Sequence, residues 1–452
     1  MAYAGRHGFR RTMVHLSMLL VLLIGMPIGS SAAPGRQEVF IREFEIGRST
    51  QGRPINAIQI GNGPRKLVLV GATHGFPEAN TYVLSSLLAE HFRANPHEIP
   101  PSVRLYIIPL LNPDGLALGT RFNARGVDLN RNMNTNHDAC PENNWSVTVQ
   151  GAYGIVSDTG GAYADSEVET RLIRNFLLDA SAVIFYHSNA GNVFPAACEH
   201  TPSITLAQQY AQAAGYAYAR YWEAYTITGG MHDWAGSLGI AAIIPELITG
   251  TLPEFEQNLA GVRGVLEAAD LLLPPLEEQI VGGYAVPAPI WRFWRMHGGI
   301  ERFGPALAAA EQKADGVVRQ HFANTTLVLD PKYADTPYLV QPEAIGRNVV
   351  TTNALALEPP ADARIFAETG QPLFGAFAVV WEIHGGSEVF GLPISGEYTA
   401  LAADGQRRIM QRFERVVFAY YPEDDRVRLE PLGWSQYLRE QLQAAPLVHQ
   451  FR

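Results

Sequence analysis

The chain has 452 residues, of which 47% are hydrophobic and 17% charged, and this composition is that of a globular protein rather than a disordered one. Its length exceeds what one hydrophobic core usually organises, so two or more domains are expected. The formal net charge of −10 disfavours nucleic acid as a partner, because phosphate binding needs a basic surface.

Residues 1–32 have the pattern of a secretory signal peptide. Three arginines precede an apolar run from Met13 to about Ile28, and small residues follow it. We therefore expect cleavage near Ala32 and a mature protein that is secreted or held at the cell surface, without membrane association after cleavage. An uncleaved membrane anchor is the alternative, and Pro27 argues against it.

The first long apolar strand is expected at Lys66–Val70, and a polar segment with His74 and Glu78 follows it. A histidine and a glutamate at a strand end, beside a helix start, suit a zinc site because imidazole and carboxylate are both good Zn²⁺ ligands. A lone histidine at such a place is otherwise usually structural. The helix that follows is expected to bury one face, made of Val83, Leu84, Leu87, Leu88 and Phe92.

The next apolar strand, Val103–Leu111, runs into a polar stretch at residues 112–132. This stretch opens with Asn-Pro-Asp-Gly, a strong turn former, because proline fixes φ and glycine permits positive φ. It closes with Asp-Leu-Asn-Arg-Asn. A polar run that starts where a strand ends is in the usual place for a site of an open α/β sheet. A polar surface loop is the alternative.

Three later segments add polar residues beside apolar strands. A helix is expected from Asp165 through Leu177, where Ser166 and Glu169 have the spacing of a capping box. The apolar strands 182–186 and 241–247 carry His187 and Glu246 at or just beyond their ends, and Tyr225 precedes Gly-Gly, His232 and an Asp-Trp pair. Cys140 and Cys198 can form a disulfide in an exported chain, and two free buried thiols are the alternative.

Together these segments resemble the zinc carboxypeptidase family of metallopeptidases. Asn-Pro-Asp-Gly followed by Asp-Leu-Asn-Arg-Asn is a specific compound motif of that family. Gly-Arg-Ser-x-x-Gly-Arg-Pro-Ile at 47–55 resembles a segment of its bacterial members. The resemblance covers about residues 40–275. It implies an α/β fold, an α/β/α sandwich around a mixed, mostly parallel sheet, in a catalytic domain at 37–275.

The resemblance implies one Zn²⁺ ion per chain, bound by His74, Glu78 and His187, with a fourth position open for water. Glu246 corresponds to the general base, which takes a proton from the water and delivers it to the leaving amine. Arg121 corresponds to the arginine that polarises the scissile carbonyl and stabilises the oxyanion. Arg125 is the alternative for that role.

Four residues correspond to substrate-binding positions of the family. Asn130 and Arg131 would hold the terminal carboxylate of the substrate, which a guanidinium fork matches. Tyr225 corresponds to the mobile tyrosine that closes over the substrate. His232 corresponds to the specificity residue at the pocket bottom, and the hypothesis is that it favours a polar or acidic terminal side chain. A histidine hydrogen-bonded in the pocket wall is the alternative.

One spacing departs from the common family pattern. Two residues usually separate the ligand histidine from the glutamate, whereas three separate His74 from Glu78. The loop can absorb the extra residue, with Pro77 just before or within the first helical turn, so both ligands are kept. The alternative is that Glu78 points away and no metal is bound.

A linker is expected at 276–289 and a smaller repeat module at 290–445. Phe293–Gly304 returns as Val380–Gly391. The second copy resembles the Leu-Gly-Phe-Pro repeats of bacterial wall enzymes, which implies binding to cell-wall polysaccharide. The His-Gly-Gly sequence within each copy is interpreted as a turn rather than a metal site.

The expected function is that of a secreted zinc metallocarboxypeptidase, which hydrolyses the C-terminal bond of a peptide. Three alternatives stay open. The first is cleavage of murein stem peptides by the same machinery, which the repeat module would suit. The second is an amidoacid deacylase of the aspartoacylase type, against which the Asn-Pro-Asp-Gly turn and Tyr225 speak. The third is a zinc-free wall-binding protein on the same scaffold.

Overall fold

The computed structural model describes residues 39–151, 154–350 and 354–444, so the expected signal peptide lies outside the described part. Among the described residues, no helix combines the length and the apolar character needed to cross a membrane. The described residues from Val39 to Ala444 form one compact unit. The expected catalytic domain and repeat module are therefore packed together rather than strung on a linker.

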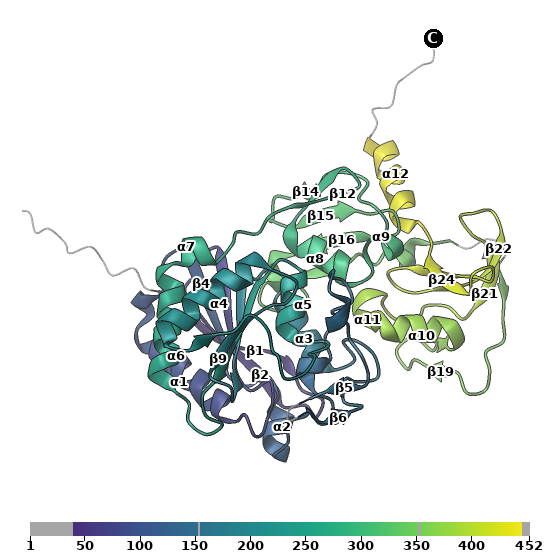
Figure 1. The fold of residues 1–452 in the computed structure, drawn as a ribbon. Coiled ribbons are helices and arrows are strands. Elements are labelled where there is room, and N and C mark those ends of the chain that lie inside the picture. The colour runs from purple at the N-terminus through teal and green to yellow at the C-terminus, as the bar shows by residue number, and fades with distance from the viewer. Residues whose placement is uncertain (1–38, 152–153, 351–353, 445–452) are drawn as a thin grey trace, which may run out of the picture. The chain divides into compact units, whose positions relative to one another are not determined.

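A nine-stranded mixed sheet forms the centre of the N-terminal part (Figure 1). The strand order is β1-β2-β4-β3-β7-β11-β9-β10, and β8 pairs with β11. The four central strands β4, β3, β7 and β11 are parallel to one another, whereas β1, β2 and β9 join antiparallel. The strands are β1 (Ile41–Arg48), β2 (Pro54–Ile60), β3 (Arg65–Val70), β4 (Val103–Ile108), β7 (Ala182–Phe185), β8 (His187–Ser188), β9 (Asn192–Pro195), β10 (Ala217–Tyr218) and β11 (Ala241–Leu247).

Helices cover both faces of this sheet, because its central strands are apolar on both sides. Along β3, Leu67 and Leu69 belong to one hydrophobic core and Val68 and Val70 to the other, as the alternation of a strand requires. This three-layer arrangement confirms the expected α/β/α sandwich. The first core is closed by α1 (Asn80–Ala94), α4 (Thr201–Ala214), α6 (Phe255–Glu267) and α7 (Ala269–Leu272), and the second by α3 (Val168–Phe176) and α5 (Met231–Ser237).

Two of these helices differ from the sequence prediction. In α1, Leu84, Leu88 and Phe92 are buried as expected, but Val83 is 45% exposed, because the buried stripe is narrower than the predicted face. Helix α3 begins at Val168, three residues after the predicted start at Asp165, and no capping box forms at its start. Ser166 and Glu169 hydrogen-bond instead to groups from distant segments, namely the Asn132 side-chain amide at 3.0 Å and the Thr50 backbone N–H at 2.8 Å.

The segment 276–289, expected as a linker, is part of the fold. It contains a hairpin of β12 (Gln279–Val281) and β13 (Tyr284–Val286), which meet across two glycines with positive φ. Both Val281 and Val286 are buried in the hydrophobic core. Paired glycines therefore serve a tight hairpin turn here rather than a flexible connection.

The two copies of the internal repeat have matching local structures. Helices α8 (Ala288–Met296) and α10 (Gly375–Ile383) are each followed by the His-Gly-Gly sequence, in which every glycine has positive φ, as expected of a turn. Trp294 Nε1 donates to the Gly304 carbonyl at 2.9 Å, and Trp381 Nε1 donates to the Gly391 carbonyl at 2.9 Å. A short helix follows each turn, α9 (Gly299–Arg302) and α11 (Gly386–Val389).

Small antiparallel sheets complete each copy. The first sheet has the order β14-β15-β16-β17 and the second β18-β21-β22-β23-β24, while β19 and β20 form a separate hairpin. Helix α12 (Leu432–Ala444) closes the described chain. The strands are β14 (Glu311–Gln312), β15 (Val318–His321), β16 (Thr326–Leu329), β17 (Val340–Pro342), β18 (Leu355–Ala356), β19 (Arg364–Ile365), β20 (Pro372–Leu373), β21 (Tyr398–Leu401), β22 (Arg407–Arg412), β23 (Val417–Tyr421) and β24 (Arg426–Leu429).

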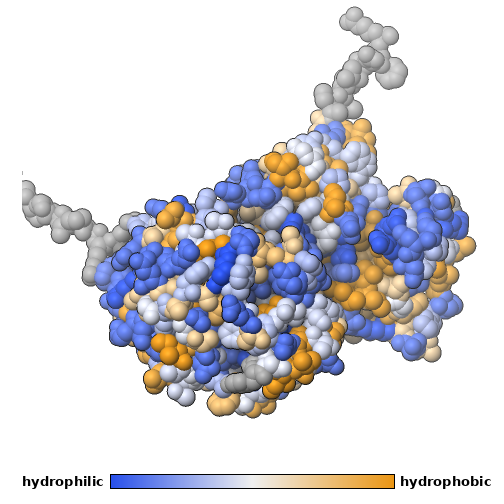
Figure 2. Space-filling model, in the orientation of Figure 1, coloured by the Kyte–Doolittle hydropathy of each residue, from blue (hydrophilic) through white to orange (hydrophobic). Residues whose placement is uncertain are grey.

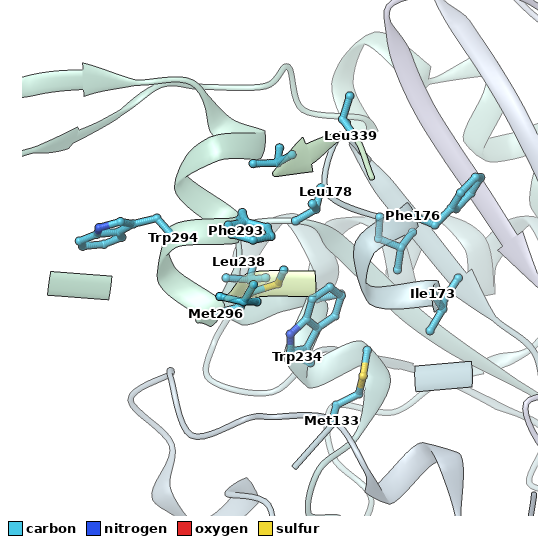
Figure 3. Packing of buried hydrophobic residues seen from close by; sticks show 14 of the residues in the cluster. Met133, Ile173, Phe176, Leu178, Trp234, Leu238, Phe293, Trp294, Met296 and Leu339 are labelled. Carbon is cyan, nitrogen blue, oxygen red and sulfur yellow. The ribbon is translucent and has the colours of Figure 1, made fainter. Parts of the chain in front are cut away.

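The second core continues from the sheet into the first repeat copy (Figure 3). Phe293 and Met296 of α8 belong to the same buried cluster as Leu178, Trp234 and Leu238 of the α/β/α part. The two parts of the chain thus share one hydrophobic core, which explains why they form a single compact unit.

The corresponding face of α10 has no such partner. Val379 and Ile383 stand where Arg292 and Met296 stand in the first copy, and they are 55% and 41% exposed. Figure 2 shows hydrophobic residues gathered on the surface where α10 and α11 lie. The two copies are therefore alike in fold but differ in what they contact.

Candidate active site

A single pocket of about 1020 Å³ gathers every residue for which the sequence predicts a catalytic, metal-binding or substrate-binding role. Its lining includes His74, Glu78, Arg121, Asn130, Arg131, His187, Tyr225, His232 and Glu246. Arg125, the alternative to Arg121, is not in the lining; its side chain is 54% exposed and lies 3.6 Å from Glu167.

Three buried residues converge on one point of this pocket. His74 Nδ1 lies 2.7 Å from one carboxylate oxygen of Glu78, and His187 Nδ1 lies 2.8 Å from the other. The ligand atoms of these three residues are all within 4.8 Å of one another. Two imidazole nitrogens and one carboxylate fit zinc, and three protein ligands are the pattern of a catalytic rather than a structural zinc site.

Asp128 holds His74 in the orientation that a metal needs. Its carboxylate accepts a hydrogen bond from His74 Nε2 at 2.8 Å, so the lone pair of the neutral imidazole is left on Nδ1, the atom that faces Glu78. This role of Asp128 was not predicted from the sequence. The residue lies within the Asp-Leu-Asn-Arg-Asn motif, but a motif does not tell which histidine a carboxylate contacts.

The loop between His74 and Glu78 absorbs the extra residue by packing closely on α2 (Pro113–Leu118). A Cβ atom at Gly75 would lie 2.1 Å from the backbone of Gly115, so only glycine fits there. Phe76 N donates to the Thr120 carbonyl at 2.9 Å. Glu78 stands just before the helix that starts at Asn80, and its carboxylate lies against both histidines despite the long spacing.

Asn-Pro-Asp-Gly starts the short helix α2 rather than forming an isolated turn. Asn112 caps this helix, because its side-chain oxygen accepts a hydrogen bond from Gly115 N at 2.8 Å. Asp114 accepts from Ser49 Oγ at 2.8 Å and from Gln51 N at 2.9 Å. The motif at 47–55 and the motif at 112–115 therefore hold each other in place beside the loop between His74 and Glu78.

Arg121 and Glu246 lie next to the three ligand residues. Arg121 donates to Glu78 at 2.6 Å and to Asp128 at 2.9 Å. Glu246 is paired with His187 in the β8–β11 ladder. Burial, and after it the negative charge of Glu78, raises the pKa of Glu246 to about 8, against the opposing effect of two arginines. A carboxyl with a pKa near neutrality suits proton transfer.

The predicted substrate-binding residues lie around the start of α5. Asn130 accepts from Met231 N at 2.9 Å through its side-chain oxygen, and Arg131 donates to the Asn130 carbonyl at 2.8 Å. The ring of Tyr225 lies 5.9 Å from the Arg131 guanidinium. His232 is 5% exposed, and its Nε2 lies 3.3 Å from Asp233.

Cys140 and Cys198 form a disulfide, which decides between the two alternatives that the sequence left open. The bond joins the chain before Pro141 to the segment after β9, and Cys198 lines the pocket. Asp138 and the two cysteines form a second group of metal-type side chains among the described residues. Because both sulfurs are in the disulfide, this group offers no thiolate ligand.

Comparison with known proteins finds similarity in the N-terminal half of the chain. Residues 35–257 match the family model described as zinc carboxypeptidase, a family of hydrolytic metallopeptidases. Carboxypeptidase SOL1 of Arabidopsis thaliana is 32% identical over 103 residues, which are 20% of this chain and 21% of that protein. Murein peptide amidase A of Escherichia coli K12 is 27% identical over 243 residues, 50% of this chain and 87% of the amidase.

Solved structures of similar proteins include the murein-tripeptide amidase of Escherichia coli O157, with 23% identity, a TM-score of 0.37, and coverage of 48% of this chain and 91% of that one. Bovine thrombin-activatable fibrinolysis inhibitor has 19% identity, a TM-score of 0.43, and coverage of 51% and 90%. The chain spans about a fifth of the Arabidopsis carboxypeptidase and most of the amidase.

Proposed function

We propose that residues 35–257, the part of the chain that matches the zinc carboxypeptidase family, form a zinc-dependent hydrolase that cleaves the C-terminal peptide bond of its substrate. The observation that carries this proposal is the convergence of His74, Glu78 and His187 in one pocket with Glu246. One zinc ion per chain would be held by these three ligands.

When bound, zinc would supply a Lewis acid that polarises water and the scissile carbonyl. Glu246 accepts the proton of the attacking water and passes it to the leaving amine. Arg121, which already contacts the ligand Glu78, stabilises the negative charge that develops on the carbonyl oxygen. Asp128 keeps both His74 and Arg121 in place for this step.

Substrate binding falls to the residues at the start of α5. The guanidinium of Arg131 and the amide of Asn130 would hold the terminal carboxylate of the substrate, and Tyr225, beside Arg131, would cover it. A substrate held in this way would present the bond to be cleaved to Glu246, which lines the same pocket.

A second candidate keeps the same machinery but takes a murein stem peptide. The 27% identity to murein peptide amidase A, over 87% of that protein, supports it. The repeat module, if it binds cell-wall polysaccharide, would bring the pocket to such a substrate.

Export to the cell surface is part of the proposal. The basic and apolar pattern of residues 1–32 supports it. The Cys140–Cys198 disulfide agrees, because such bonds persist mainly outside reducing compartments.

The proposal is tested by assaying the purified zinc-loaded protein with blocked dipeptides and with purified murein peptides, beside Glu246→Gln. We expect release of the C-terminal residue and a fall in kcat of about 10²–10⁴-fold in the variant. Zinc content should be unchanged in the variant, and Glu90→Gln on the solvent side of α1 should match the wild type. Hydrolysis of murein peptides alone would favour the second candidate, and turnover that survives Glu246→Gln would refute the mechanism.

A further inference from the structure

The inner end of the pocket, around the start of α5, holds buried polar atoms that have no partner in the protein. Asn143 is 3% exposed, and its amide nitrogen donates to Asp138 at 3.1 Å. This bond fixes the orientation of the amide, and the oxygen Oδ1 is left buried and without a hydrogen bond. His232 Nδ1 is unpartnered in the same way. A buried acceptor without a donor costs about 1–3 kcal/mol, so a ligand that supplies the donor gains affinity.

Several contacts place Asn143 and Asp233 at the same end of the pocket. The Asn143 carbonyl accepts from Gly229 N at 3.0 Å, two residues before α5 begins, and its amide nitrogen is 4.0 Å from Cys198 Sγ. Asp233 in the first turn of α5 accepts from Ala197 N at 2.8 Å, next to that cysteine. Asn143, Ala197, Cys198 and Asp233 all line the pocket.

The charges at this end favour a positive group. Asp233 is 5% exposed, and Asp138 stands behind the Asn143 amide. Among the described residues that line the pocket, the only lysine or arginine side chains are Arg121, Arg131 and Arg220. The first two have roles at the reacting bond and the terminal carboxylate, and Arg220 is paired with the exposed Glu199.

His232 adds no positive charge to this end of the pocket. Burial, opposed by Asp233 and assisted by Arg131, lowers the pKa of His232, so its imidazole is neutral at physiological pH. A neutral imidazole does not attract a carboxylate, and the hypothesis of an acidic terminal side chain loses its basis. As a neutral group His232 can still share a hydrogen bond with a bound polar side chain.

We propose that this end of the pocket binds a substrate side chain that ends in an amine, with Asn143 Oδ1 and the Asp233 carboxylate as acceptors. The inference rests on the proposed function and deepens it, because it names the residue class at the cleaved C-terminus. A site built around buried acceptors discriminates against an analogue without the donor, since the acceptors would then be buried unpaired.

The first experiment compares blocked dipeptides that end in lysine, norleucine or glutamate. Lysine and norleucine differ in the terminal amine but have side chains of nearly equal length. We expect kcat/KM for lysine to exceed that for norleucine by at least about 10-fold, which is 1.4 kcal/mol. Asn143→Leu should bring the ratio towards one, and Asn144→Leu, outside the pocket lining, should leave it unchanged. A ratio near one, a preference for glutamate, or a ratio that Asn143→Leu does not lower would overturn the inference.

The second experiment needs no turnover, so failure of the proposed function is distinguished from failure of this inference. Free lysine and free norleucine are titrated into the zinc-loaded full chain by isothermal calorimetry. Tighter binding of lysine by about 10-fold or more, lost in Asn143→Leu, supports the inference even if no dipeptide is cleaved. Equal binding of the two amino acids overturns it even if both dipeptides are cleaved.

Discussion

Asp128 binds two groups of the candidate site at once. One of its carboxylate oxygens accepts from His74 Nε2 and the other from the Arg121 guanidinium, and the residue is 1% exposed. These contacts fix the imidazole of a proposed zinc ligand and the guanidinium that would stabilise the oxyanion. Asp128 therefore acts as a positioning residue for both.

Asp128→Asn tests this role. An amide keeps one acceptor but presents a donor to either His74 or Arg121, so one of the two contacts becomes repulsive. We expect zinc affinity, measured by competition with a chelator, to fall about 10–100-fold while the fold is retained. Asp270→Asn, at a side chain that is 82% exposed, is the matched control. Unchanged zinc affinity in Asp128→Asn would show that zinc binding does not depend on the hydrogen bond between His74 and Asp128.

At the residue scale, the family pattern was enough to select nine residues that line one pocket, and their roles stay predictions. It could not find Asp128 or Asn143, whose roles depend on which atom faces which partner. The spacing of Ser166 and Glu169 predicted a capping box that does not form, since Asn132 and Thr50 take those side chains from across the fold. Local patterns fail where distant segments compete for the same polar group.

Helix α8 joins the repeat module to the sheet through Arg292. This arginine is 5% exposed and donates to the carbonyls of Leu178, Ala180 and Leu238 at 2.8–3.0 Å. Burial lowers its pKa to about 10, so it remains charged at neutral pH. Because one charged side chain donates to three buried carbonyls, these contacts hold α8 in its position against the N-terminal part of the chain.

Arg292→Met should destabilise the protein strongly. The thioether fills part of the volume but leaves three carbonyls without a donor, each at a cost of about 1–3 kcal/mol. We expect a loss of at least about 3 kcal/mol in the free energy of unfolding, measured by urea denaturation. Arg93→Met removes an exposed pair with Glu43 and should cost no more than about 1 kcal/mol. Equal effects of the two substitutions would contradict the docking role of α8.

The end of α10 should make the stability of the protein depend on pH. Burial, helped by Arg302, lowers the pKa of His384 to about 3 from its ordinary value of 6.5. The folded state therefore favours the neutral imidazole. The stability from this group is complete above pH 6.5 and is lost as the pH falls from 6.5 towards 3, because only the unfolded chain takes up the proton.

We expect the wild type to lose about 1 kcal/mol more than His384→Gln between pH 6.5 and 5.5, because one titrating group contributes up to 1.36 kcal/mol per pH unit. Urea midpoints at the two pH values give this difference. Parallel losses in the two proteins would mean that His384 is protonated in the folded state as easily as in the unfolded one.

At the element scale, the apolar strands were predictable because their residues are buried on both faces. The segment 276–289 was not, since paired glycines and prolines are equally typical of a flexible linker and of a tight hairpin. Val281 and Val286 are buried in the core and identify the segment as a hairpin, but their burial is known only from the structure. In α1, the exposure of Val83 likewise depends on how the helix is rotated against the sheet.

The described part of the chain is one unit in which the matched family domain and the repeat module share a core. The family model ends at residue 257, yet the cluster that contains Trp234 continues into Phe293 and Met296. This continuity was not predictable from sequence, because the repeat looked like a separate module. It means that the repeat supports the catalytic fold in addition to any role in binding the cell wall.

The central claim, that this chain binds catalytic zinc despite the long His74–Glu78 spacing, is tested most directly by the zinc content of the purified protein. Elemental analysis of the wild type, Glu78→Ala and Glu90→Ala after zinc loading and dialysis gives the stoichiometry. We predict one zinc per chain in the wild type and in Glu90→Ala, and little or none in Glu78→Ala. A wild type without zinc after loading, or a Glu78→Ala variant that retains it fully, would contradict the account.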